Sequence, residues 1–313
     1  MSIIRDSILG DCYDVLAGKS RDIKINDAST VSLVDCTPRL CPTGRTCEYA
    51  IVRAARVSYG LGMKTPEQDK RLIDYLIRHY HTSPFEFVQF TFRIECPIFV
   101  ARQIMRHRTF SFNEHSARYS EMKDRFYLPT EFGTQDTVNK QGSINTELTN
   151  DKVDTLQQYY KETYDMAYTN YQKLIDNGIS REQARILLPV GIVTEMYATV
   201  DLGNLLKFLR LRMDEHTQKE TRDIANAMYE LVKQVIPTVI ESWDTHNRLS
   251  VTFSSREVEC IKRDISMGDA YPNTSINERN EFTNKYKKIK PDSTTADTIK
   301  TDSISDTIIE IKL

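Results

Sequence analysis

The chain has no long apolar run and almost no excess of either charge. No stretch of its 313 residues reaches the roughly eighteen apolar residues typical of a membrane-spanning helix. The first ten residues include Arg5 and Asp6, which argues against a secretory signal. The formal net charge of −2 argues against a protein attracted mainly to nucleic-acid phosphates. We therefore expect an intracellular, cytoplasmic protein whose partners include neither a membrane nor a nucleic-acid polymer.

Cysteines are few, and their spacing matches no known framework. Three of the six, Cys36, Cys41 and Cys47, fall within twelve residues, but they contain no Cys-x-x-Cys pair and no partner pair follows. Scattered cysteines in a long chain are typical of proteins that keep their thiols reduced. We expect neither a bound metal nor a disulfide framework.

Glycine is also scarce, and its two suggestive positions fail as nucleotide-binding loops. Gly60-Leu61-Gly62 lacks the third glycine of a dinucleotide fingerprint. Gly18-Lys19-Ser20 lacks the upstream glycine of a phosphate-binding loop, because position 13 is Tyr13. Any dinucleotide must therefore be held by side chains and not by a glycine turn.

What the sequence does have is a dense polar stretch from Arg106 to Tyr119, directly after a predicted helix that begins behind Pro97. Its fourteen positions hold three arginines, two histidines, one glutamate and two serines. One or two cations here would simply complement a helix C-terminus. Three guanidinium groups exceed that need, and they suit phosphates, carboxylates or flat rings rich in carbonyl groups. The stretch therefore predicts a binding site.

This stretch resembles the signature of the flavin-dependent thymidylate synthases. The resemblance rests on Arg106-His107-Arg108, a gap of seven residues and Ser116, with Asn113-Glu114 and Arg118-Tyr119 around them. It extends from about Leu33 to about Trp243. It implies that dUMP is methylated to dTMP with methylenetetrahydrofolate as carbon donor and with FAD, reduced by NADPH, as hydride source. It also implies a homotetramer whose sites are shared between subunits.

The resemblance assigns roles to residues on several distant segments. The implied flavin contacts are Ser58, His81, Arg106, His107, Arg108, Glu114, Lys207 and His216. The implied substrate contacts are Gln103, Glu114, Ser116, Arg118, Arg185 and Arg212, and the catalytic candidates are Arg212, Ser116 and His81. In this role Arg212 would polarise the uracil ring, while Arg118, Arg185 and Ser116 would hold the nucleotide. By residue type alone, Ser58 is more typical of a helix cap or turn, and His81 of a cation at a helix end.

Three positions depart from the family pattern. Phe87 stands where members often carry a second histidine, and Asp201 and Lys207 stand where some carry asparagine. A relative that has lost catalysis is therefore one rival interpretation. A nucleotide- or RNA-binding module is another, although it would favour a basic chain with exposed aromatic residues. No protein nucleophile is expected, because Cys41 and Cys96 each precede a proline and lie outside the polar stretch.

Hydrophobic periodicity predicts an α+β fold, with helices packed on a small, mostly antiparallel sheet. The predicted strands are 31–34, 88–95 and 194–200, and the predicted helices are 47–57, one from 66, 98–105, 151–177, 204–212 and 224–235. Residues 133–150 predict a surface loop. The tyrosine row of the long helix, Tyr160, Tyr164, Tyr168 and Tyr171, is typical of a core or subunit contact. The domains predicted are an N-terminal extension (1–30), a catalytic domain (31–266) and a polar, disordered tail (267–313) with a short binding segment at 308–311.

Overall fold

The computed structural model describes residues 21–39, 41, 45–59, 64–136, 142–145, 148–289 and 309–310. The chain divides into two compact units, the first comprising residues 1–69 and 82–237 and the second residues 70–81 and 238–313. No helix in the described ranges is both long and apolar enough to cross a membrane. The glycine motifs at 18–20 and 60–62, and most of the segment 308–311, lie outside the described residues.

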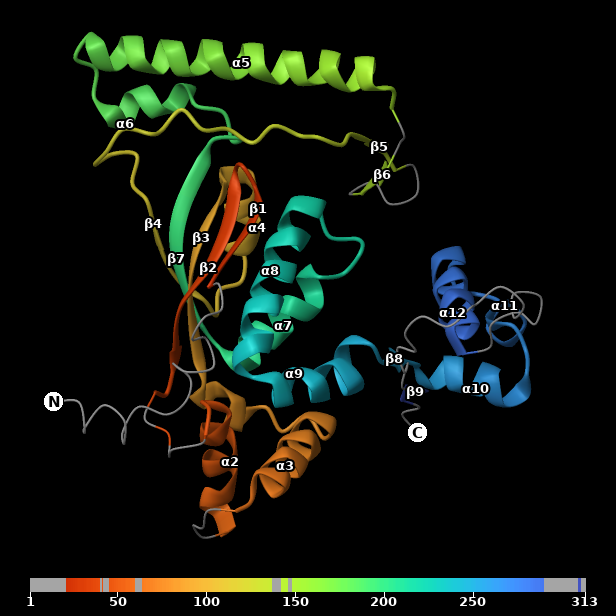
Figure 1. Cartoon of the computed structure of the whole chain (residues 1–313). Coiled ribbons are helices and arrows are strands. Elements are labelled where there is room, and N and C mark those ends of the chain that lie inside the picture. Colours follow the sequence, from red (N-terminus) through yellow and green to blue (C-terminus); the bar gives the residue numbers. More distant parts are fainter. Residues whose placement is uncertain are drawn as a thin grey trace, which may run out of the picture. The chain divides into compact units, whose positions relative to one another are not determined.

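The elements of both units are labelled in Figure 1. The strands are β1 (Asp22–Asn26), β2 (Ser29–Thr37), β3 (Gln89–Pro97), β4 (Ser111–Glu114), β5 (Gly133–Gln135), β6 (Ser143–Asn145), β7 (Val193–Asp201), β8 (Val251–Thr252) and β9 (Ile309–Glu310). The α-helices are α2 (Glu48–Arg56), α3 (Pro66–Arg78), α4 (Ile98–Ile104), α5 (Asn150–Asp176), α6 (Arg181–Ala184), α7 (Leu202–Arg212), α8 (Lys219–Val235), α9 (Pro237–Trp243), α10 (Ser255–Arg263), α11 (Met267–Ala270) and α12 (Ile276–Ile289). Shorter helical turns are η1 (Val57–Tyr59), η2 (Ser83–Phe87), η3 (Arg185–Leu187) and η4 (Asp244–Arg248).

The first unit is built on a five-stranded antiparallel sheet with the order β1-β2-β3-β7-β4. On the central strand β3, alternate side chains such as Phe92 and Ile94 are fully buried. On the other face Arg93 forms ion pairs at 2.6 Å with Glu95 and with Glu195. This alternation is the pattern of a half-buried strand. The predicted α+β fold, with helices on a small antiparallel sheet, is confirmed.

Helix α8 covers β1 and β2, and α4 and α7 pack against α8. Its buried face repeats every three to four residues, as Ile224, Met228, Leu231 and Val235 show, and each is fully buried. This spacing forms one apolar stripe along the helix. Thr221, in the first turn, is the polar member of that stripe and is also fully buried. A buried hydroxyl requires a hydrogen-bond partner, and its partner lies in the candidate site.

The tyrosines of α5 pack onto the segment that follows the polar stretch. Tyr171 is fully buried, and its hydroxyl accepts a hydrogen bond from the backbone N–H of Met122 at 3.1 Å. The Tyr168 hydroxyl donates to the Met122 carbonyl, and the Tyr164 hydroxyl donates to the Tyr127 carbonyl, both at 3.0 Å. Each ring thus buries apolar area while its hydroxyl stays bonded. The predicted packing role is confirmed for these three tyrosines.

A buried ion-pair cluster joins α2 to the first turn of α3. The Asp69 carboxylate lies 2.8 Å from Arg45 Nη1 and 2.6 Å from Arg56 Nη1. All three side chains are at most 14% exposed. The angles of approach are poor for hydrogen bonds, so the attraction is mainly coulombic. Because Arg56 ends α2, this cluster fixes the backbone from which Ser58 projects on η1.

In the second unit, the later turns of α3 are tied to α9 and η4. Asp74 Oδ1 accepts hydrogen bonds from Ser242 Oγ at 3.0 Å and from His246 Nε2 at 2.9 Å. Lys70 forms an ion pair with Glu241 at 2.7 Å. The rest of the unit has a small core of its own, formed by Val251, Phe253, Val258, Cys260, Met267 and Phe282.

Three predictions about segments are wrong in part. Residues 22–30 belong to the sheet and not to an extension, because the short β1 pairs with β2. Within the predicted loop 133–150, β5 and β6 form an antiparallel pair. Within the predicted disordered tail, residues 267–289 contain α11 and α12. Their few apolar side chains, Met267 and Phe282 above all, are widely spaced in the sequence yet meet in one core, so low apolar density concealed the helices.

Candidate active site

Helix α4 leads from the central strand β3 into the polar stretch and carries the first site residue. Its Val100, Ala101 and Ile104 are buried, which fixes the helix against the sheet and α8. Arg102 and Gln103 lie outside this buried stripe. Consecutive residues point about 100° apart around a helix, so these two side chains contact different parts of the protein.

Gln103 is held by the start of α8. Its Oε1 accepts a hydrogen bond from the buried Thr221 hydroxyl at 3.0 Å, and its Nε2 donates to Gln218 Oε1. Its backbone carbonyl accepts a hydrogen bond from Arg212 Nη2 at 3.4 Å. These bonds define the orientation of the amide and bring Arg212, at the end of α7, beside α4.

Arg212 and His107 form the central contact of this group, which we call the Arg212 cluster (Gln103, His107, Arg212 and Thr221). Arg212 Nε donates to His107 Nε2 at 2.9 Å. Because arginine only donates, Nε2 must be the unprotonated nitrogen of a neutral imidazole. Burial, and then the charge of Arg212, lower the pKa of His107. Burial also lowers the pKa of the Arg212 guanidinium.

The His107 ring is fixed by aromatic packing. It stands edge-on to Phe208, with centroids 4.8 Å apart and planes at 79°, and it also packs against Phe110. Phe110 is buried and stacks on Phe112. The polar stretch therefore supplies its own apolar support, and Arg212 is a cation held in one orientation.

A cavity of about 260 Å³ lies beside α4 and holds two of the predicted substrate residues, Glu114 and Arg185. Thr194 Oγ1 donates to Glu114 Oε1 at 2.7 Å and so orients the carboxylate. Arg102 also lines this cavity. In the described part of the chain neither Arg102 nor Arg185 forms an ion pair. We call this cavity the Arg185 pocket; its apolar lining includes Ile98, Ala101, Met105, Leu188 and Ile192.

Ser116 and Arg118 lie on one tight turn. Ser116 Oγ accepts a hydrogen bond from the backbone N–H of Arg118 at 3.3 Å. The Arg118 side chain forms an exposed ion pair with Glu182 at 2.9 Å. Such an exposed pair contributes only about 0–1 kcal/mol, so a ligand can displace it. No base contacts the Ser116 hydroxyl among the described residues, which favours a binding role over a nucleophilic one.

Of the remaining predicted residues in the first unit, Arg106, Arg108 and Ser58 are exposed. Neither arginine forms an ion pair with a described carboxylate. Lys207 and His216 are exposed as well: Lys207 Nζ lies 3.4 Å from Asn204, and His216 bonds to Asp214. No hydrogen bond or ion pair connects these five residues to the Arg212 cluster within the described ranges.

The departure from the family pattern at Asp201 has a structural explanation. Asp201 is the N-cap of α7, and its Oδ1 accepts a hydrogen bond from the Asn204 backbone N–H at 2.9 Å. Its Oδ2 accepts from the Asn204 side chain at 2.6 Å. Aspartate and asparagine cap helices equally well, so this exchange preserves the helix that carries Arg212. The Phe87 side chain is 64% exposed.

In the second unit, His81 lies just past the end of α3. Its backbone N–H donates to the Leu76 carbonyl at 2.8 Å, and the preceding Tyr80 has a positive φ of 58°. A bulky residue in this left-handed conformation is uncommon. The rings of His81, His79 and Tyr75 pack near one another, with centroids 4.3–6.4 Å apart. The exposed His81 ring is thus oriented by aromatic neighbours.

Cys96 lies close to the site in the sheet, but its surroundings do not favour a reactive thiolate. It is fully buried at the end of β3, where it pairs with Thr194. Burial, and then the charge of Glu114, raise the pKa of its thiol far above the usual range. A nucleophilic cysteine requires the opposite shift, toward the thiolate.

A family model described as "Thymidylate synthase complementing protein" matches residues 39–238. A flavin-dependent thymidylate synthase from Dictyostelium discoideum is 44% identical over 286 residues, which are 90% of this chain and 92% of that protein. The chain belongs to the flavin-dependent thymidylate synthase family. The sequence resemblance is therefore confirmed, as is the prediction that the chain is an enzyme.

Other similar proteins also match the flavin-dependent thymidylate synthase chain over most of its length. The Treponema denticola protein of the same name is 44% identical over 256 residues, covering 80% of this chain and 92% of that protein. Two crystal structures of the UMP/dUMP methylase PolB from Streptomyces cacaoi, with 5-Br UMP or 5-Br dUMP bound, match with TM-scores of 0.63 and 0.62. Their identities are 33% and 32%, and they cover 71% of this chain and 96% and 97% of theirs.

Sequence reasoning missed three residues of the candidate site: Arg102, Thr194 and Thr221. Thr221 had a signal, because it is a polar residue at an apolar position of the α8 stripe. Arg102 directly precedes Gln103, but the motif resemblance assigned it no role. Thr194 had no signal, since threonine is ordinary in a strand.

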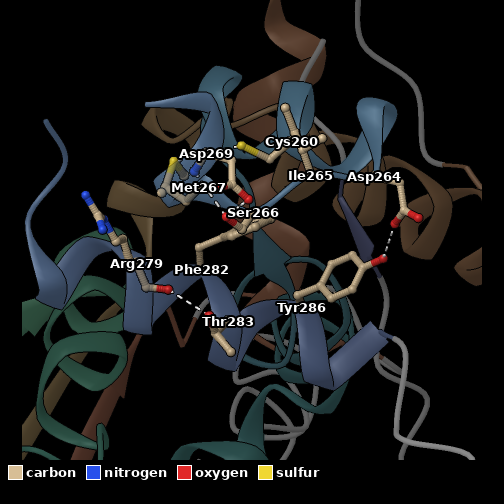
Figure 2. A pocket seen from close by; sticks show the side chains of 11 residues that line it. Cys260, Asp264, Ile265, Ser266, Met267, Asp269, Arg279, Phe282, Thr283 and Tyr286 are labelled. Atoms are coloured by element: carbon tan, nitrogen blue, oxygen red, sulfur yellow. Dashed lines mark hydrogen bonds between the residues drawn. The ribbon is translucent and has the colours of Figure 1, made fainter. Parts of the chain in front are cut away.

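A second cavity, of about 560 Å³, lies in the second unit between α12 and the segment that ends α10 (Figure 2). Figure 2 shows Phe282 and Tyr286 of α12 below Met267 and Cys260, whose sulfur atoms are 3.9 Å apart. No predicted site residue lines this cavity. It also lies beyond residue 238, where the family match ends. None of its lining residues belongs to the Arg212 cluster or to the Arg185 pocket.

Proposed function

We propose that this chain is a flavin-dependent thymidylate synthase that methylates dUMP to dTMP. Methylenetetrahydrofolate is the carbon donor, FAD is the cofactor and NADPH is the reductant. The observation that carries the proposal is the Arg212 cluster, in which a cation is held by His107 and Gln103. The Arg185 pocket, bordered by the same helix α4, adds a carboxylate and two arginines that form no ion pair with any described residue.

The site residues then have distinct roles in the methylation of dUMP. Arg212 stabilises negative charge that develops on the uracil carbonyl oxygens, because a fixed cation needs no reorganisation when the charge appears. Arg185, Ser116 and Arg118 hold the nucleotide, and Glu114 is oriented toward it by Thr194. When bound, the reduced flavin supplies the hydride that converts the transferred methylene to methyl while tetrahydrofolate leaves.

The exposed residues of the polar stretch suit an anionic, planar cofactor. Arg106 and Arg108 offer guanidinium donors that no described carboxylate occupies, so a dinucleotide can use them without breaking an ion pair. His81 and Ser58 lie on other segments. We propose that these segments meet the flavin in a homotetramer with shared sites. The exposed apolar side chains Ile186, Leu187 and Val190, which follow Arg185, support such an interface.

The test is an anaerobic assay of dTMP formation from dUMP and methylenetetrahydrofolate, with and without NADPH. We expect product only when NADPH is present. The assay includes UMP as a second substrate, since the similar PolB structures are named for both nucleotides. We expect dUMP to be preferred, because the similar proteins from Dictyostelium discoideum and Treponema denticola are named thymidylate synthases. Absence of dTMP from a flavin-loaded chain would refute the proposal.

Replacing Cys96 with alanine should leave turnover within about a factor of three. The thiol is buried and held protonated, so it has no chemical role to lose. Alanine leaves a small cavity, and a modest loss of stability is expected from it. The measurement is the anaerobic rate of dTMP formation at a temperature where both proteins are folded. Loss of all activity in a folded Cys96→Ala protein would contradict the thiol-independent reaction.

The neutral state of His107 predicts an acid limit to activity. The unfolded imidazole takes up a proton near pH 6.5, whereas the folded one does so only at lower pH. The stabilisation from neutral His107 is therefore complete above pH 6.5 and is lost as pH falls through the lowered pKa. Protonation also removes the acceptor for Arg212. In His107→Gln, whose amide oxygen can accept the same hydrogen bond without titrating, the acid limb of dTMP formation should disappear. An unchanged acid limb in that variant would contradict this role.

A further inference from the structure

We propose that Arg102 is a second cation for the nucleotide phosphate in the Arg185 pocket. This inference rests on the proposed function, and it adds a residue to the nucleotide site. Arg102 on α4 and Arg185 on η3 line the same cavity of about 260 Å³, together with Glu114. Both arginines are exposed to solvent, and neither forms an ion pair with a described residue.

The charges in the pocket call for a second cation. A phosphate monoester carries about −1.5 to −2 charges near neutral pH. Glu114 adds a further negative charge to the same cavity. Within the cavity Arg185 alone offsets only part of this negative charge, and Arg102 adds a second positive charge there. Guanidinium groups also match phosphate oxygens with paired donors.

The other arginine that the proposed function assigns to the nucleotide, Arg118, lies outside this cavity. Arg118 is paired with Glu182 at 2.9 Å. Arg102, in contrast, already borders the cavity from a helix whose Val100, Ala101 and Ile104 are buried. The backbone that carries Arg102 is therefore fixed by packing.

Arg102 also lies between the two parts of the site, the Arg212 cluster and the Arg185 pocket. Its neighbour Gln103 belongs to the Arg212 cluster, while Arg102 borders the Arg185 pocket. One helix turn therefore presents a contact to each half. This arrangement suits a nucleotide whose base lies at the cluster and whose phosphate lies in the pocket.

The test compares two ligands that differ only in the phosphate. The flavin-loaded protein is titrated with dUMP and with deoxyuridine, and Arg102→Gln is measured beside the matched control Arg53→Gln. Arg53 is an exposed cation on α2 that lines none of the described pockets. We expect Arg102→Gln to weaken dUMP binding by about tenfold to a hundredfold, as for a lost charged hydrogen bond. Binding of deoxyuridine should not change, Arg102→Lys should recover part of the loss, and Arg53→Gln should match the wild type.

Equal weakening of both ligands by Arg102→Gln would indicate a structural role and overturn the inference. Unchanged dUMP binding in that variant, with normal dTMP formation by the wild type, would overturn the inference alone. A flavin-loaded wild type that neither binds nor converts dUMP would overturn the proposed function as well.

Discussion

Replacing Arg212 with alanine is expected to lower the rate of dTMP formation at least about a hundredfold while the protein stays folded. Removing a fixed donor that stabilises transition-state charge typically costs this much. The proposed function assigns this role to Arg212, whose guanidinium is held by His107 and the Gln103 carbonyl. Bound flavin should be largely retained. The measurement is single-turnover dTMP formation alongside flavin content.

Arg210→Ala is the matched control for this prediction. Arg210 lies on the same helix two residues earlier, is exposed, and belongs to neither half of the site. It should turn over like the wild type. Normal turnover in Arg212→Ala would remove the central residue from the mechanism.

A double-mutant cycle tests whether His107 acts through Arg212. If the imidazole serves to orient the guanidinium, removing His107 should cost activity in the wild-type background and little in Arg212→Ala. Additive losses would instead assign His107 an independent role, such as direct contact with the flavin.

Replacing Asp69 with asparagine is expected to cost about 3–5 kcal/mol of unfolding free energy, because it leaves two nearly buried guanidinium groups without their counter-charge. The shared carboxylate lies 2.8 Å and 2.6 Å from Arg45 and Arg56. The measurement is a urea titration of the flavin-loaded protein.

Asp27→Asn is the control for Asp69. It removes an ion pair of similar length, 2.7 Å to Lys24, but the Asp27 side chain is 99% exposed. Water screens that pair, so little change in stability is expected. Equal effects of the two substitutions would contradict the importance assigned to burial around Asp69.

Local sequence patterns were sufficient to predict the helices and strands that have one apolar and one polar face. The alternation in β3, and the spacing of buried residues in α7 and α8, predicted these elements because each has one apolar face. Strand β1 and helix α12 escaped prediction for the opposite reason. The few apolar residues of β1 become informative only when the strand pairs with β2, the next element along the chain, and those of α12 only when α10 lies beside it.

The same distinction holds for the site. The motif resemblance pointed to Gln103, His107 and Arg212, but no local pattern relates residues that are 105 positions apart, as His107 and Arg212 are. The bond between Gln103 and Thr221 spans 118 positions. Arg102 shares a cavity with Arg185 only because α4 and η3 meet in the fold. Tertiary structure supplied these contacts.

The most direct test of flavin-mediated methylation follows the absorbance of the bound flavin under argon. The purified protein should be yellow and should bleach when NADPH is added. Colour should return when dUMP and methylenetetrahydrofolate are added together, with one dTMP formed per flavin reoxidised. Recovery of colour without dTMP, or dTMP formed by a colourless protein, would contradict the account.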